Sequence, residues 1–138
     1  MTTRASRNGL HVPPSRVGRV LPKQLVVEPA TLDIGGPIDE RLAPDNTVRY
    51  AAEWSQGRAR GQARIEIRPT SKVSTDIVVE LSHANGARAF FWSKPRRHRL
   101  ASLFANALAY HVETRDGEKA HAFDVRRTTP ELVRARSA

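Results

Sequence analysis

The sequence of 138 residues contains no cysteine, and its apolar stretches are only a few residues long. The absence of cysteine excludes disulfides, thiol catalysis and thiolate metal ligands, so we expect a reducing, cytoplasmic setting. A helix that crosses a bilayer needs about 20 consecutive apolar residues, and no segment reaches that length. We therefore expect no membrane span.

Acidic residues are also scarce relative to basic ones. The chain has 14 Asp and Glu against 23 Lys and Arg, a net charge of +9, and 19 of the basic residues are arginines. Arginine makes two-pronged contacts with phosphate and carboxylate groups, which favours an anionic partner. The alternative is that the arginines form a solvated face that keeps the chain in solution.

The first 27 residues are basic and contain no acidic residue. Transit peptides share this composition, but they form amphipathic helices, which Gly9, Pro13 and Pro14 would interrupt. We expect residues 1–9 to be a disordered basic tail. Residues 10–127 should form a single domain, and residues 128–138 a frayed tail.

Period-two alternation of apolar residues predicts a sheet in the middle of the chain. Val48, Tyr50, Ala52 and Trp54 fall on one face of a strand, and the glycine-rich segment 55–61 follows as a hairpin loop. The predicted antiparallel meander consists of strands at 47–54, 62–68, 75–82 and 88–92.

The segment before this meander is rich in proline and glycine. Pro14 opens a short helical turn that Pro22 ends, and a strand at 24–27 follows. Residues 29–46 are expected to be mostly loop, with one extended piece near 31–34.

Apolar residues at helical spacing predict one amphipathic helix over about residues 95–112. Ser93 or Lys94 is the expected N-cap, and Pro95 occupies the first turn, where its missing N–H has no cost. The stripe expected to lie on the sheet consists of Leu100, Leu103, Phe104, Ala107, Leu108 and His111. The fold class is therefore α+β: a twisted antiparallel meander with one long amphipathic helix, near the C-terminus, packed on it.

The chain beyond this helix carries weaker signals. Asp116 and Gly117 predict the end of the helix. His121, Phe123 and Val125 alternate and indicate a last strand.

This order of elements resembles the START-related superfamily, whose bacterial members are labelled polyketide cyclase/dehydrase or SRPBCC proteins. The resemblance covers residues 10–112 and rests on the rhythm of the central strands and on V-P-P-S-R-V-G-R-V-L. In that segment the residues that imitate the family's first strand and following helix are Val12, Pro13, Pro14, Val17, Val20 and Leu21.

The resemblance implies a helix-grip fold with a ligand cavity between sheet and helix. The family places two short helices after its first strand, and residues 22–46 are too short and too rich in proline and glycine to form them. The cavity would then be open, reduced or completed by a second subunit, so a homodimer is among the expected assemblies.

The first functional hypothesis is a non-catalytic protein that holds a hydrophobic or aromatic small molecule between sheet and helix. Of the residues expected to face the cavity, only Tyr50, Trp54 and His111 carry polar groups. The alternative is that all of them pack as an ordinary core. The complete set is Tyr50, Trp54, Ile65, Ile67, Val79, Leu81, Trp92, Phe104, Leu108 and His111.

The second hypothesis is a basic protein that binds nucleic acid, as RNA, ribonucleoprotein or DNA. The residues assigned to this role are Arg58, Arg60, Lys94, Arg96, Arg97 and Arg99. Four of them lie in the first turns of the predicted helix, where the helix dipole disfavours positive charge and a bound anion would relieve it. Trp54 and Trp92 border these clusters in sequence and are candidates for stacking on bases.

An enzymatic function has the weakest support. The five histidines show no spacing typical of metal ligands, and the sequence has neither a phosphate-binding glycine loop nor a complete catalytic motif. We expect no cofactor. A cavity between sheet and helix would favour the small-molecule hypothesis, and a filled core would favour the nucleic-acid hypothesis.

Overall fold

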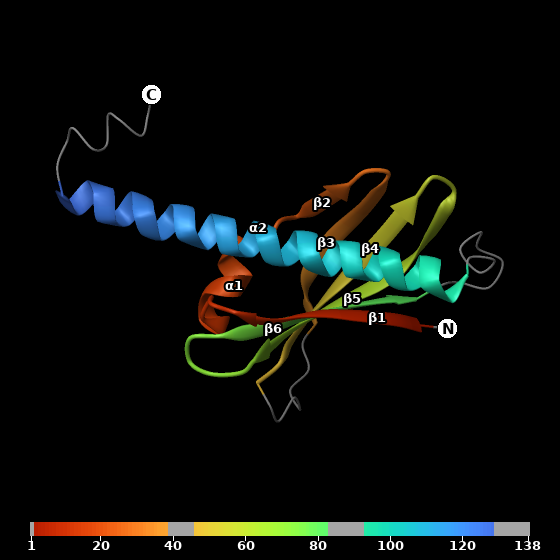
Figure 1. Cartoon of the computed structure of the whole chain (residues 1–138), viewed down its shortest axis with the longest axis horizontal. Coiled ribbons are helices and arrows are strands. Elements are labelled where there is room, and N and C mark those ends of the chain that lie inside the picture. Colours follow the sequence, from red (N-terminus) through yellow and green to blue (C-terminus); the bar gives the residue numbers. More distant parts are fainter. Residues whose placement is uncertain (1, 39–45, 83–92, 129–138) are drawn as a thin grey trace.

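The computed structural model describes residues 2–38, 46–82 and 93–128, and over 118–128 the path of the backbone alone. It confirms the α+β class: a curled six-stranded antiparallel sheet with one long helix lying across it (Figure 1). The elements are β1 (Thr2–Leu10), α1 (Pro14–Val20), β2 (Gln24–Val27), β3 (Ala30–Ile38), β4 (Val48–Gln56), β5 (Ala59–Pro69), β6 (Thr75–Ser82) and α2 (Lys94–Thr128).

The strand order is β1-β6-β5-β4-β3-β2, and every neighbouring pair is antiparallel. Strands β2 to β6 therefore form a meander, and β1 extends it by pairing with β6. The strands predicted at 47–54, 62–68 and 75–82 are confirmed as β4, β5 and β6. The strand predicted at 88–92 lies outside the described residues.

Strand β1 replaces most of the disordered tail expected over residues 1–9. It pairs with β6 from Thr2, opposite Ser82, to Leu10, opposite Thr75. The polar composition suggested disorder, but an edge strand with one solvated face needs few apolar side chains. Its exposed arginines and serine also suit an edge that must not pair with other chains.

The extended piece expected near 31–34 is confirmed as part of β3, but the strand is longer than predicted and occupies residues 30–38, which were expected to be mostly loop. Residues 30–33 pair with β2, and residues 30–34, 37 and 38 pair with β4. The sheet accommodates Gly36 and Pro37 because its register shifts between Ile34 and Pro37, where strict ladder pairing is interrupted.

The hairpin loop predicted over 55–61 is a two-residue turn at Gly57 and Arg58. Gln56 pairs with Ala59 on either side of it. Gly57 has a φ of +60°, which is the backbone conformation that such a turn requires at its first position. Both strands are therefore longer than predicted, and Gly61 lies inside β5.

Helix α2 begins as predicted but continues further. The Oγ atom of Ser93 accepts a hydrogen bond of 3.3 Å from the backbone N–H of Arg96, which confirms Ser93 as the N-cap. The predicted end near Asp116 and Gly117 is wrong, because the helix runs to Thr128. A glycine inside a helix costs only about 1 kcal/mol, and an ion pair of 3.3 Å from Arg16 of α1 holds Asp116 in place.

The strand predicted around His121, Phe123 and Val125 is consequently wrong as well, since these positions belong to α2. Three alternating residues are too few to outweigh the good helix formers that precede them. In Figure 1 the last turns of α2 project beyond the sheet, past α1.

The hydrophobic core lies between α2 and the curled sheet. The apolar side of each central strand faces it, and α1 closes one end with Val17 and Val20. The fully buried side chains of α2 in this core are Ala101, Phe104, Ala105, Leu108 and Val112. Burial of a large apolar side chain contributes about 2 kcal/mol, so this layer supplies most of the stability.

Trp54 crosses from β4 over β5 to β6. It is 1% exposed, and its indole N–H donates a hydrogen bond of 3.0 Å to the carbonyl oxygen of Ser82. This path requires a glycine at position 61: a Cβ atom there would overlap the Ser82 oxygen and lie 2.7 Å from the indole nitrogen. Gly61 therefore allows the tryptophan to join three strands.

We expect Gly61→Ala to lower the free energy of unfolding by about 2 kcal/mol, because the backbone must shift to make room for the methyl group. Gly36→Ala is the matched control, since a Cβ atom at this other strand position has nothing within 4 Å. Urea denaturation measures both. Equal losses of stability in the two variants would contradict this account of Trp54.

Candidate anion-binding surface

Six of the ten residues expected to line a ligand cavity form the filled centre of the core. They are Trp54, Ile65, Val79, Leu81, Phe104 and Leu108, and each is at most 1% exposed. A side chain facing a cavity wide enough for water would keep accessible surface on that side. These positions therefore have no space beside them for a ligand.

The remaining four expected cavity residues differ from one another. Ile67 is 3% exposed and also belongs to the core. His111 is half-buried, and Trp92 lies outside the described residues. Tyr50 is half-buried with its hydroxyl beside Gly18 of α1, and burial raises the pKa of this phenol. The structure therefore brings the apolar members together as a core.

The basic residues of the β4–β5 turn and of the start of α2 lie at one end of the molecule. Asp116 of α2 pairs with α1, which follows the C-terminal end of β1. The start of α2 is about 33 Å away along the helix. It lies beside the N-terminal end of β1, and the β4–β5 turn points to this same end (Figure 1). We call this group the basic end; its members are Arg58, Arg60, Lys94, Arg96 and Arg99, all exposed.

The start of α2 concentrates positive charge where the backbone already carries some. The first turn contains no acidic residue, and the aligned backbone dipoles of the helix add about half a positive charge at this end. Arg97 differs from its neighbours because it is 9% exposed. Arg97 is therefore packed against the rest of the protein. Of the residues that the sequence assigns to anion binding at the start of α2, Lys94, Arg96 and Arg99 are exposed enough to contact an anion.

A second group of arginines surrounds Glu66 on the outer face of the sheet, the face turned away from α2. Glu66 is only 4% exposed because the arginine side chains cover it. Its carboxylate accepts hydrogen bonds from Arg68 at 2.6 Å, from Arg4 at 3.2 Å and from Arg49 at 3.3 Å. This cluster joins strands β1, β4 and β5, and Arg4 also forms an ion pair of 3.4 Å with Glu80 of β6.

Sequence reasoning missed the cluster around Glu66. One signal was available, because Arg64, Glu66 and Arg68 alternate on the solvent side of a predicted strand. The contribution of Arg4 was hidden by the expectation that residues 1–9 are disordered.

Two opposing effects set the pKa of Glu66. Burial raises it, but hydrogen bonds from Arg68 and Arg49, and the positive charges of Arg68 and Arg4, outweigh burial and lower the pKa below its ordinary value of 4.5. A carboxyl whose pKa is lower in the folded protein stabilises the fold above pH 4.5, and this stabilisation is lost as the pH falls through the lowered value.

We expect Glu66→Gln to lower the free energy of unfolding at pH 7 by about 2 kcal/mol, because the buried carboxylate that accepts hydrogen bonds from three arginines loses its charge. The difference from the wild type should shrink as the pH falls from 4.5 through the lowered pKa, because the wild-type carboxyl of the folded protein then becomes protonated as well. Glu53→Gln, at an exposed position of β4, is the control and should change stability by less than about 0.5 kcal/mol. Denaturation at several pH values measures both; a pH-independent difference for Glu66→Gln would contradict this assignment.

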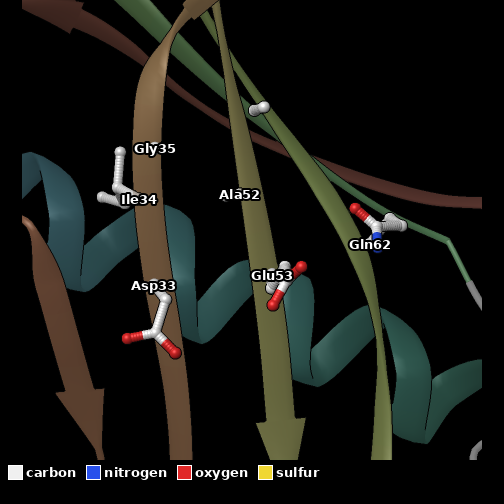
Figure 2. Close-up of a pocket in the computed structure, with 7 residues that line it drawn as sticks. Asp33, Ile34, Gly35, Ala52, Glu53 and Gln62 are labelled. Carbon is white, nitrogen blue, oxygen red and sulfur yellow. The ribbon is translucent and has the colours of Figure 1, made fainter.

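The same outer face also has an acidic part. A shallow hollow of about 280 Å³ lies over β3, β4 and β5, with the side chains of Asp33, Glu53 and Gln62 in front of the strands and α2 behind them (Figure 2). Asp33 and Glu53 are cross-strand partners, and Asp33 accepts a hydrogen bond of 2.8 Å from Gln24. This region repels anions, so it does not extend the surface that the basic end offers to them.

Within the described part of the chain, no three histidine or acidic side chains are grouped as a metal site would require. None of the described helices combines the length and the apolar character needed to cross a bilayer. Comparisons with protein-family models, curated proteins and solved structures found no match for this chain.

Proposed function

We propose that this protein binds nucleic acid through the basic end, chiefly by contacts to phosphates. One observation carries the proposal: five exposed cations from two segments far apart in the sequence, the β4–β5 turn and the start of α2, share one end of the fold. Such a surface gains affinity by releasing the counter-ions condensed on a nucleic acid. The net charge of +9 adds long-range attraction.

The burial of Trp54 bears on the mode of binding. Its indole N–H is already bonded to Ser82, and its ring lies inside the core, so it does not stack on bases as the sequence suggested. The basic end contacts phosphates and reads no base edges, so we propose binding without sequence preference. We place this activity in the cytoplasm, since a cysteine-free chain has no need of an oxidising compartment.

We expect the affinity for RNA and DNA oligonucleotides to fall steeply with salt. The double variants Arg58→Gln/Arg60→Gln and Lys94→Gln/Arg96→Gln should each weaken binding and reduce the slope of log K against log salt by about one unit per cation removed. Fluorescence anisotropy at four salt concentrations measures the affinities and the slopes.

The matched control is Arg7→Gln/Lys72→Gln, which removes two exposed cations from the opposite end of the sheet, where β1 meets the start of β6. This variant should keep most of the wild-type slope. The proposal fails if the wild type does not bind at about 20 mM salt. It also fails if the control loses as much affinity as the two variants of the basic end.

A second candidate function is the binding of a hydrophobic small molecule, as the START-related resemblance implies. The arrangement that favours it is the placement of β1 beside the last described strand, with a long C-terminal helix over the curled face of the sheet. A ligand would have to separate side chains that are fully buried, Phe104 and Leu108 among them. The filled core therefore makes this the weaker candidate.

Thermal unfolding with a panel of lipophilic dyes and aromatic ligands separates the two candidates. A ligand at one hundred times its dissociation constant adds about 2.7 kcal/mol and raises the melting temperature by several degrees. We expect no such rise with any member of the panel. A reproducible rise would support the START-like function.

A further inference from the structure

The side of α2 that points away from the sheet carries two large apolar side chains in contact with solvent. Leu103 is 45% exposed and Tyr110 is 73% exposed, and half-buried Ala107 lies between them. Seven residues make two helical turns, so Leu103 and Tyr110 share one stripe. Figure 1 shows α2 in front of the sheet, with no described element lying over this side.

Charged residues of opposite sign flank this apolar pair. Arg99 lies one turn before Leu103, and Glu113 lies about one turn after Tyr110; both are exposed. Neither has an ion pair with another described residue of the chain. The stripe therefore has the order basic, apolar, apolar, acidic along the helix.

Two copies of this stripe that run in opposite directions are complementary to each other, because the basic end of one stripe then faces the acidic end of the other. If a second copy of α2 lies antiparallel to the first, Leu103 of one copy faces Tyr110 of the other, and Arg99 faces the neighbourhood of Glu113. A two-fold axis repeats each contact, as in the symmetric interfaces of homodimers. The balanced charges of the stripe do not favour an anionic membrane or a strongly charged partner.

We propose that the stripe of Arg99, Leu103, Ala107, Tyr110 and Glu113 is the surface through which two copies of this chain associate. The association is independent of nucleic acid and adds to the function proposed above. A contact of about four helical turns is smaller than a stable interface, which buries at least about 1,200 Å². The dimer is therefore weak, and its population depends on protein concentration.

Sedimentation equilibrium of the full chain, from about 10 µM to 1 mM and without nucleic acid, tests this proposal. The wild type should show a growing fraction of dimer. Tyr110→Ser should raise the dissociation constant at least about tenfold, because it removes the largest apolar side chain of the contact. Val73→Ser is the control, since Val73 is 65% exposed in the turn between β5 and β6 and should not affect association.

A charge exchange shows whether the contact joins two copies. Arg99→Glu and Glu113→Arg should each weaken the dimer, because like charges then face each other across the axis. The double variant Arg99→Glu/Glu113→Arg should restore association. The two residues are about 21 Å apart along one helix, so restoration requires contact between copies.

Three results would overturn the proposal. The first is a wild type that stays monomeric up to about 1 mM. The second is a dimer that Tyr110→Ser leaves unchanged, which would place the contact elsewhere. The third is a double variant as weak as the single ones. Circular dichroism confirms that each variant is folded, which the exposure of all the substituted side chains leads us to expect.

Discussion

The apolar side of α2, with Phe104 and Leu108 at its centre, shares one buried cluster with Ile65 and Val79 of the curled sheet. This contact fills the space in which a ligand would have to lie. It also fixes the direction and the rotation of the helix. The direction brings the positive start of α2 to the same end as the β4–β5 turn, and the rotation turns Leu103 and Tyr110 toward solvent. Both proposed surfaces are consequences of this one packing arrangement.

The opposite face of the sheet is organised by charge. No described helix covers it. Arginines from three strands donate hydrogen bonds to the carboxylate of Glu66 and cover it. One of them, Arg4, is 62 positions away in the sequence. This contact helps to explain how β1, a polar strand with few apolar side chains, stays attached to the sheet. The arginine excess of the chain therefore has a structural role here, in addition to the attraction of anions.

The elements that could be predicted from the sequence were those whose apolar residues recur at the regular spacing of a strand or a helix. Alternation identified β4, β5 and β6, and the apolar stripe with its Ser93 cap identified α2, because burial on one side imposes these periods directly. Strand β1 was missed, and β3 was predicted too short. Pairing with β6 stabilises β1, and pairing with two neighbouring strands stabilises β3, although the composition of both segments is unfavourable for strands. Seven of the ten predicted cavity residues pack together in the core, but whether a group of apolar residues encloses space or fills it depends on packing, which no period reveals.

The two proposed surfaces have a geometric relation that follows from helix dimensions. If Leu103 of one copy faces Tyr110 of the other, the two-fold axis passes between positions 106 and 107. The two Lys94 residues then lie on opposite sides of this axis, about 37 Å apart at 1.5 Å per residue. One turn of duplex DNA spans about 34 to 36 Å. An antiparallel pair of α2 helices therefore spaces two basic ends by nearly one turn, so a duplex longer than this could engage both at once. Binding to the second end would then be intramolecular, and a weak dimer and a weak phosphate contact would strengthen each other without any new contact.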